Sequence, residues 1–221
     1  MIIDLYIYLS VVILCFIILL FALLILNEKL HYFKVHQLIF SYVVYIFFFF
    51  LFSKIVHMII NNDFYVFFVK LNKTSIKKFL LLGYAFIGGY IGTMIFVNFI
   101  SKIFKLDKNK LFILYMSNML LFYAILKISC YVKGCCGGYL IIPIQLIETF
   151  TFLGAYLYII YLILHNINLK TVLSRSIILF GILRLVLSIF KIYSHLYSFI
   201  VIEILCLIII VIGYKMRWKN E

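Results

Sequence analysis

Charged residues and proline are scarce in this chain, and their scarcity excludes a water-soluble fold. Only 12% of the 221 residues are charged and one is proline, whereas 67% are apolar and 19% aromatic. A globular domain of this composition could not cover its surface with polar groups. Apolar runs of about 20 residues can cross roughly 30 Å of hydrocarbon as helices, and runs of this kind recur along nearly the whole chain. The sequence therefore predicts an integral membrane protein.

The apolar runs predict an all-α fold, a polytopic membrane helix bundle that forms a single transmembrane domain over residues 1–221. Each run is apolar on every face, whereas the strands of a membrane barrel alternate apolar and polar residues. No linker, low-complexity tract or internal repeat divides the chain. About seven crossings are expected, the second and sixth of them short: Leu5–Leu26, Gln37–Phe52, Phe79–Ile100, Leu111–Val132, Ile144–His165, Ile177–Phe190 and Leu196–Tyr214.

The charges that do occur are mostly basic and lie between the apolar runs. The chain has 20 Lys and Arg against 7 Asp and Glu, which favours anionic lipid headgroups as neighbours and gives no reason to expect nucleic acid. With the N-terminus outside, 11 basic residues fall on the cytoplasmic side and 8 on the other, which favours this orientation. Lys77 and Lys78 argue against this orientation unless residues 63–72, apolar and aromatic between polar ends, lie along the interface.

Among the charged residues inside the apolar runs are Glu148, Arg184 and Glu203. A charge at membrane depth is costly unless it meets a partner or a water-filled cavity. Two interpretations of Arg184 stay open. It either pairs with Glu203 or Glu148 to hold helices together, or it faces a cavity and binds a lipid phosphate with its planar guanidinium.

Glycines gather in the segment GYAFIGGYIG, residues 83–92. Gly88 and Gly92 form a small-xxx-small pair, which lets two helix backbones approach closely. The alternative is that the glycines offer a flat surface to an acyl chain or a headgroup. The sequence alone leaves both interpretations open.

The stretch KISCYVKGCCGGYLIIPIQLIE, residues 127–148, concentrates three cysteines, three glycines and the chain's one proline. Adjacent Cys135 and Cys136 make a poor zinc chelate with no histidine nearby, so no metal site is expected. A redox centre would place a disulfide or mixed disulfide at one of these two thiols. The third interpretation is a Gly/Cys-rich loop at membrane depth, because its glycines loosen the backbone and Pro143 can start the next helix.

This stretch resembles the signature loop of the prolipoprotein diacylglyceryl transferase family, in its cysteine-containing variant. The family pattern runs roughly G-R-x-G-C-F-x-x-G-C-C-x-G and then P-x-Q-L-Y-E. The positions that match it in register are Cys130, Gly134, Cys135, Cys136, Gly138, Pro143, Gln145, Leu146 and Glu148. Two further segments follow in the family's order: Gly88 and Gly89 resemble its His-Gly-Gly segment, and Gly181, Arg184, Ser188 and Lys191 keep the spacing of its G-x-x-R-x-x-x-E-x-x-R.

The resemblance implies transfer of a diacylglyceryl group from phosphatidylglycerol to the cysteine thiol of a lipoprotein precursor in the bacterial plasma membrane, with release of glycerol phosphate. This chemistry needs positive charge at the phosphate and an acceptor for the thiol proton. The expected catalytic residues are Arg184 and Lys127 for the phosphate and Glu148 for the proton. The expected substrate-binding residues are Gly88, Gly89, Cys130, Gly134, Cys135, Cys136, Gly138, Gln145 and Lys191. The expected partners are phosphatidylglycerol, a lipoprotein precursor or lipobox-like peptide, and membrane lipids; no cofactor is expected.

Four positions depart from the family pattern. Lys127, Ile87, Ser129 and Ser188 stand where arginine, histidine, glycine and glutamate are usual. A lysine keeps the charge but offers a point contact instead of a fork, and isoleucine cannot accept a proton. The departures motivate an alternative, a protein of the same fold that binds a lipid or lipopeptide without modifying it. A membrane thiol oxidoreductase is the third hypothesis.

Overall fold

The described residues of this chain form an all-α bundle. The computed structural model describes residues 2–30, 32–61, 85–132, 134, 143–165, 167–191 and 196–218. Its helices are α1 (Ile2–Leu30), α2 (Val35–Asn61), α5 (Phe86–Ile103), α6 (Lys108–Val132), α7 (Ile144–Leu164), α8 (Leu169–Ser188) and α9 (Leu196–Trp218). All seven are long and apolar enough to cross a membrane. The predicted polytopic bundle is confirmed, and the chain is a multi-pass membrane protein.

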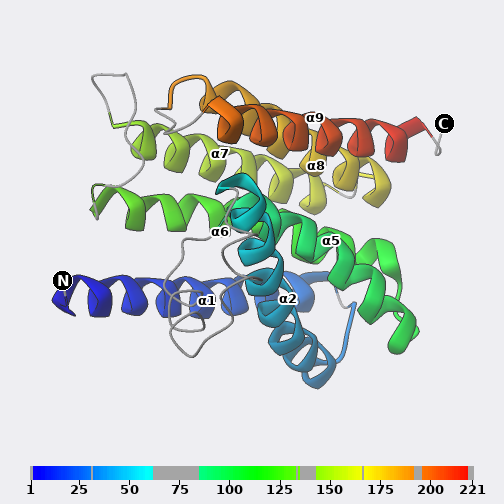
Figure 1. Cartoon of the computed structure of the whole chain (residues 1–221). Coiled ribbons are helices and arrows are strands. Elements are labelled where there is room, and N and C mark those ends of the chain that lie inside the picture. The colour runs from blue at the N-terminus through cyan, green and yellow to red at the C-terminus, as the bar shows by residue number, and fades with distance from the viewer. Residues whose placement is uncertain are drawn as a thin grey trace, which may run out of the picture.

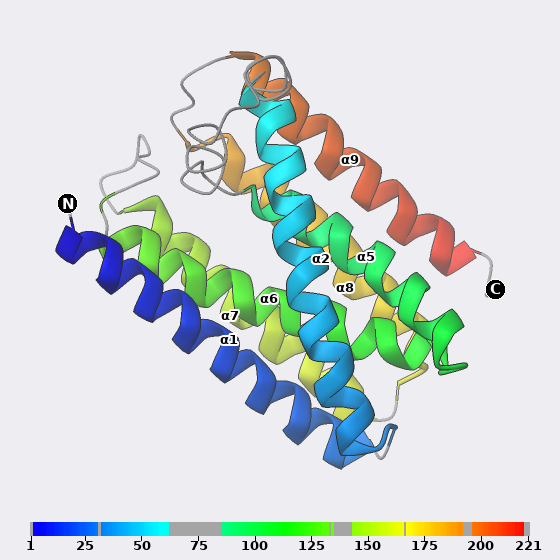
Figure 2. The same cartoon turned by 60° about the horizontal axis from the view of Figure 1, so that its bottom comes forward.

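Helix α6 lies in the middle of the bundle, in contact with α1, α5, α7 and α8 (Figures 1 and 2). Around it, α2 packs on α5 and α9 packs on α8. Successive helices alternate in direction, so α1 begins and α9 ends at opposite ends of the bundle (Figure 1). The last turns of α6 and α8 and the first turn of α7 lie toward the end where α1 begins. We call this the N-terminal end of the bundle, and the opposite one the C-terminal end.

The glycines of α5 lie against α2. A β-carbon added to Gly88 would come within 2.3 Å of the Phe52 carbonyl oxygen, and one added to Gly92 within 2.8 Å of the Phe48 carbonyl oxygen. A β-carbon on Gly89 would collide with the Phe49 ring at 2.2 Å. The backbones of α5 and α2 are therefore as close as a small-xxx-small pair allows, and this geometry supports the packing interpretation of the glycines.

Helix α2 is longer than predicted, because polar residues do not end it. The predicted crossing stopped at Phe52, but the helix continues to Asn61. Lys54 is buried, and the apolar residues Val56 and Ile60 beyond it also turn toward the bundle interior. The apolar run underestimated the length of α2. Lys54 lowers the local hydropathy, but the side of the helix that faces the bundle interior continues past it.

Helix α8 begins at Leu169, earlier than the predicted start at Ile177. Asn168 caps it, with its side-chain oxygen accepting from the backbone N–H of Lys170 at 3.0 Å, as expected of an N-cap residue. The first turns are polar but still packed: the Ser174 hydroxyl donates to the Gly213 carbonyl of α9 at 2.8 Å. Serines that form interhelical hydrogen bonds can be buried at little cost, which hydropathy alone does not register.

Several predicted features lie outside the described residues. They are the interfacial segment 63–72, the first part of the third predicted crossing, and the loop positions Cys135, Cys136 and Gly138.

Candidate functional site: a buried cation cluster

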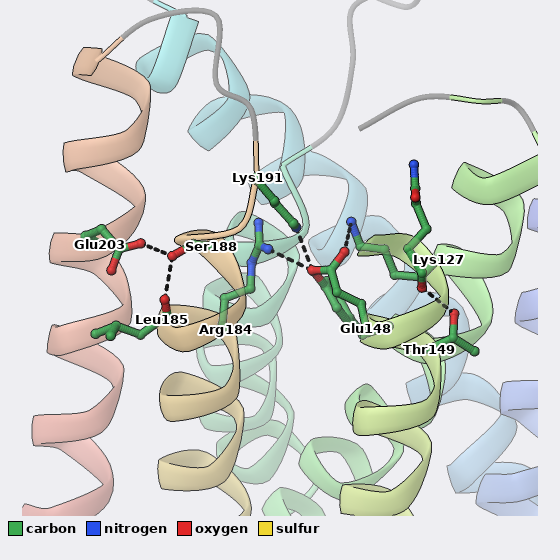
Figure 3. Close-up of polar contacts among 10 residues, drawn as sticks. Lys127, Glu148, Thr149, Arg184, Leu185, Ser188, Lys191 and Glu203 are labelled. Atoms are coloured by element: carbon green, nitrogen blue, oxygen red, sulfur yellow. Dashed lines mark hydrogen bonds and ion pairs between the residues drawn. The ribbon is translucent and has the colours of Figure 1, made fainter. Parts of the chain in front are cut away.

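Four charged side chains from three helix ends meet inside the bundle (Figure 3). Glu148 Oε1 lies 3.1 Å from Arg184 Nη1 and 2.5 Å from Lys191 Nζ, and Glu148 Oε2 lies 3.2 Å from Lys127 Nζ. We call these four residues the Glu148 cluster. The expected pairing of Arg184 with Glu148 is present, and both lysines named from the sequence join it.

The four charges lie near helix ends. Lys127 lies in the turn before the last turn of α6, Arg184 directly precedes the last turn of α8, and Lys191 follows shortly after α8. Glu148 is near the start of α7, which Pro143 precedes as the N-cap residue. Antiparallel packing of α6, α7 and α8 brings these four residues together.

An aromatic layer separates the cluster from the middle of the bundle. Tyr123, Phe152 and Phe180 stand one helical turn deeper than Lys127, Glu148 and Arg184, respectively, because residues four apart share a helix face. The centre of the Tyr123 ring lies 4.3 Å from the centre of the Phe152 ring and 6.2 Å from that of the Phe180 ring. These buried rings make the inner side of the Glu148 cluster a low-polarity environment. Electrostatic interactions between the charges are stronger in such an environment.

Tyr123 also takes part in the cluster directly. Its hydroxyl donates to Glu148 Oε1 at 2.5 Å. The Lys127 ammonium lies 5.0 Å and the Arg184 guanidinium 5.5 Å from the centre of its ring, so both cations receive cation–π stabilisation. Sequence reasoning missed Tyr123. The spacing of four between Tyr123 and Lys127 was the available signal.

The carboxylate and the cations differ in exposure. The Glu148 side chain is fully buried, whereas the side chains of Lys127, Arg184 and Lys191 are 10%, 11% and 6% exposed. Glu148 is thus on the inner side of the cluster, and the edge that reaches the surface is cationic. An anion that approaches from outside would meet the basic side chains first.

The second intramembrane glutamate is held separately. Glu203 of α9 accepts a hydrogen bond from the Ser188 hydroxyl, which also donates to the Leu185 carbonyl at 2.6 Å (Figure 3). Ser188 is the position where the family resemblance led us to expect glutamate. The carboxylate next to the end of α8 is instead supplied by Glu203 of the neighbouring helix α9, a substitution between helices that the spacing within one segment cannot predict.

The other predicted site residues lie around the cluster or on α5. Gln145 is buried one turn before Glu148, and Cys130 is a half-buried thiol one turn beyond Lys127. Gly134 has a φ of 66°, a conformation that favours glycine. Gly88 and Gly89 face α2, as described above. Among the described residues, no group of His, Cys, Asp and Glu could hold a metal ion.

Fold and site together define a class of protein: a multi-pass membrane helix bundle with a buried, predominantly cationic cluster at one end. A comparison with protein-family models gives no match for the chain. A search of curated proteins finds no significant match either.

Proposed function

We propose that this protein transfers a diacylglyceryl group from phosphatidylglycerol to the cysteine thiol of a lipoprotein precursor in a bacterial plasma membrane. The observation that carries the proposal is the Glu148 cluster, in which three basic side chains share one carboxylate. Charges removed from water need compensation, so a surplus of buried cations favours an anionic ligand. A phospholipid brings such an anion to this depth together with its acyl chains.

Within this proposal, Arg184 and Lys127 hold the phosphate. The guanidinium of Arg184 has donors in a planar fork that suits two phosphate oxygens at once, and its Nη1 donates to Glu148 Oε1 at 3.1 Å. Lys127 adds a second positive charge on the other side of the carboxylate. As the phosphate leaves, negative charge develops on it, and fixed cations lower the energy of that transition state.

The distribution of lysines supports an outward-facing site. Among the described lysines of the N-terminal end of the bundle, Lys54, Lys127 and Lys191 are buried. The described lysines of the C-terminal end are exposed, apart from the half-buried Lys110: Lys29, Lys34, Lys102, Lys105, Lys108, Lys170 and Lys215. The positive-inside rule counts basic residues next to the helix ends. The arrangement of the described lysines favours a cytoplasmic C-terminal end, and the sequence count given above, 11 against 8, points the same way. This orientation puts the cluster on the side where lipoprotein precursors emerge.

A second candidate is a protein of the same fold that binds a lipid or lipopeptide without modifying it. Two observations favour it. Ile87 is buried and provides no proton acceptor, and the Glu148 carboxylate is already engaged by Tyr123 and three cations. A third candidate, a thiol oxidoreductase, depends on Cys135 and Cys136. Mass spectrometry of alkylated protein tests it, because fully reduced, freely alkylated thiols after oxidising growth would contradict it.

The deciding experiment combines purified protein in detergent with phosphatidylglycerol and a lipobox peptide. We expect the peptide to gain the mass of one diacylglyceryl group and glycerol phosphate to be released in equal amount. A peptide with its cysteine replaced by serine is the control and should gain nothing. If the peptide stays unmodified while a classical transferase modifies it in parallel, the proposal of catalysis is wrong and the binding protein becomes the better assignment.

A further inference from the structure

The donors around the Glu148 carboxylate fall into two pairs by distance. Lys191 Nζ and the Tyr123 hydroxyl each lie 2.5 Å from Oε1. Arg184 Nη1 lies 3.1 Å from Oε1, and Lys127 Nζ lies 3.2 Å from Oε2. The side chains of Lys127 and Arg184 are also more exposed than that of Lys191, at 10% and 11% against 6%. The two short contacts therefore come from the less exposed groups, and the two longer ones from the groups nearer to an approaching ligand.

We propose that Tyr123 is a positioning residue of the anion site. Its hydroxyl keeps the Glu148 carboxylate hydrogen-bonded in place while Arg184 turns its guanidinium to a phosphate. This inference rests on the proposed function, in which Arg184 and Lys127 hold the phosphate of the lipid. It concerns the binding of that phosphate and not the transfer of a proton, so it applies equally to the candidate that binds a lipid without modifying it.

The burial of Glu148 makes a second donor of this kind necessary. The carboxylate side chain is 0% exposed, so water cannot replace a donor that moves from Oε1 to a ligand. A buried carboxylate that loses partners costs free energy, and this cost would oppose the binding of any anion that draws Arg184 away. The Tyr123 hydroxyl reduces the cost because it stays on Oε1. Since it is neutral, it does so without using positive charge that the phosphate needs.

The packing of Tyr123 holds its hydroxyl at this position. The residue is 1% exposed. The centre of its ring lies 4.6 Å from that of Phe86 and 4.3 Å from that of Phe152, so side chains of α5 and α7 both pack against it. The ring and the hydroxyl have separate tasks, because the ring attracts the cations of Lys127 and Arg184 and the hydroxyl binds the carboxylate. The substitution Tyr123→Phe removes only the second of these interactions.

The first test measures the affinity of the purified protein for glycerol phosphate by isothermal titration calorimetry in detergent. We expect Tyr123→Phe to bind glycerol phosphate about 10-fold more weakly than the wild type, a loss that corresponds to roughly one hydrogen bond to a charged group. Tyr115→Phe is the matched control on the same helix, since its buried hydroxyl is hydrogen-bonded to Ser41 Oγ of α2 at 2.7 Å. Both variants lose a buried hydrogen bond and should lose some thermal stability, but Tyr115→Phe should keep the wild-type affinity.

Two results of this titration would overturn the inference. Equal affinities of Tyr123→Phe and Tyr115→Phe would show that the Tyr123 hydroxyl serves only the fold. A wild-type protein that binds no glycerol phosphate would remove the anion site that Tyr123 is proposed to position.

The second test separates KM from kcat in the transfer reaction. Tyr123→Phe should raise the KM for phosphatidylglycerol about 10-fold and change kcat much less, as expected when an interaction present in both the bound substrate and the transition state is lost. Partial unfolding would instead lower the apparent kcat at an unchanged KM, and that result would contradict the positioning role. Failure of the transfer function is a separate result, because it appears as a wild-type protein that binds glycerol phosphate but forms no product.

Discussion

The described lysines at the two ends of this membrane bundle differ in burial. At the C-terminal end, lysines such as Lys102 and Lys170 are exposed, as expected where helices meet lipid headgroups. Among the described lysines of the N-terminal end, Lys54, Lys127 and Lys191 are buried, which costs free energy and is found where charges serve a function. In a chain with so many lysines, their number reveals nothing about a site. The burial of the described lysines distinguishes the end that holds the Glu148 cluster from the opposite end.

The largest expected effect comes from removing the one carboxylate that the buried cations share. Glu148→Gln leaves Lys127, Arg184 and Lys191 without their counter-ion, and uncompensated buried charge destabilises a protein by about 3–5 kcal/mol. We expect a strong drop in Tm in detergent, measured by thermal unfolding of the purified protein. Glu28→Gln, at an exposed position in the last turn of α1, is the matched control and should leave Tm unchanged. Similar Tm values for both variants would contradict the prediction that the buried carboxylate contributes more to stability than the exposed one.

The next effect concerns catalysis more than folding. Arg184→Ala removes the fork that we assign to the phosphate, and loss of one group that stabilises transition-state charge typically costs about 10²–10³-fold in kcat. Arg184→Lys should recover part of that loss, since it restores the charge without the fork. Arg175 provides a control on the same helix, because its Nη1 contacts only the Tyr158 hydroxyl, at 3.3 Å, among the hydrogen bonds described. An Arg184→Ala protein with the activity of Arg175→Ala would exclude the phosphate role.

The sequence was sufficient for the fold because hydropathy marks membrane helices directly. It failed at α2 and α8, where Lys54 and Ser174 are polar but buried, and burial depends on partners that are distant in sequence. For the site, the sequence identified charged residues inside apolar runs, which need a partner or a polar cavity; Glu148 and Arg184 are among them. It could not show that Arg184, Lys127 and Lys191 share one carboxylate, since that requires the packing of α6, α7 and α8.

Tyr123 is a second case in which the role of a residue depends on contacts between helices that the sequence does not reveal. Tyrosine is common in this chain, with 18 in total, so one more in an apolar run carries no signal by itself. Its role depends on the helical spacing to Lys127 together with the approach of Glu148 from α7. Side chains become informative in such a chain through their neighbours, not through their type.

The smallest effect is expected at Ser188, at the rim of the same end. Ser188→Ala removes the hydroxyl that donates to the half-buried Glu203 carboxylate, and loss of a hydrogen bond to a partly desolvated charge costs about 1–3 kcal/mol. We expect a modest fall in Tm with most transfer activity retained, because Ser188 does not contact Glu148 in the hydrogen bonds described. Ser101→Ala is the control: its hydroxyl also donates to a backbone carbonyl one turn back, at 3.1 Å, but it lies at the C-terminal end and none of its described bonds involves a carboxylate. A loss of activity in Ser188→Ala as large as in Arg184→Ala would extend the functional end of the bundle to α9 and would make Glu203 part of the site.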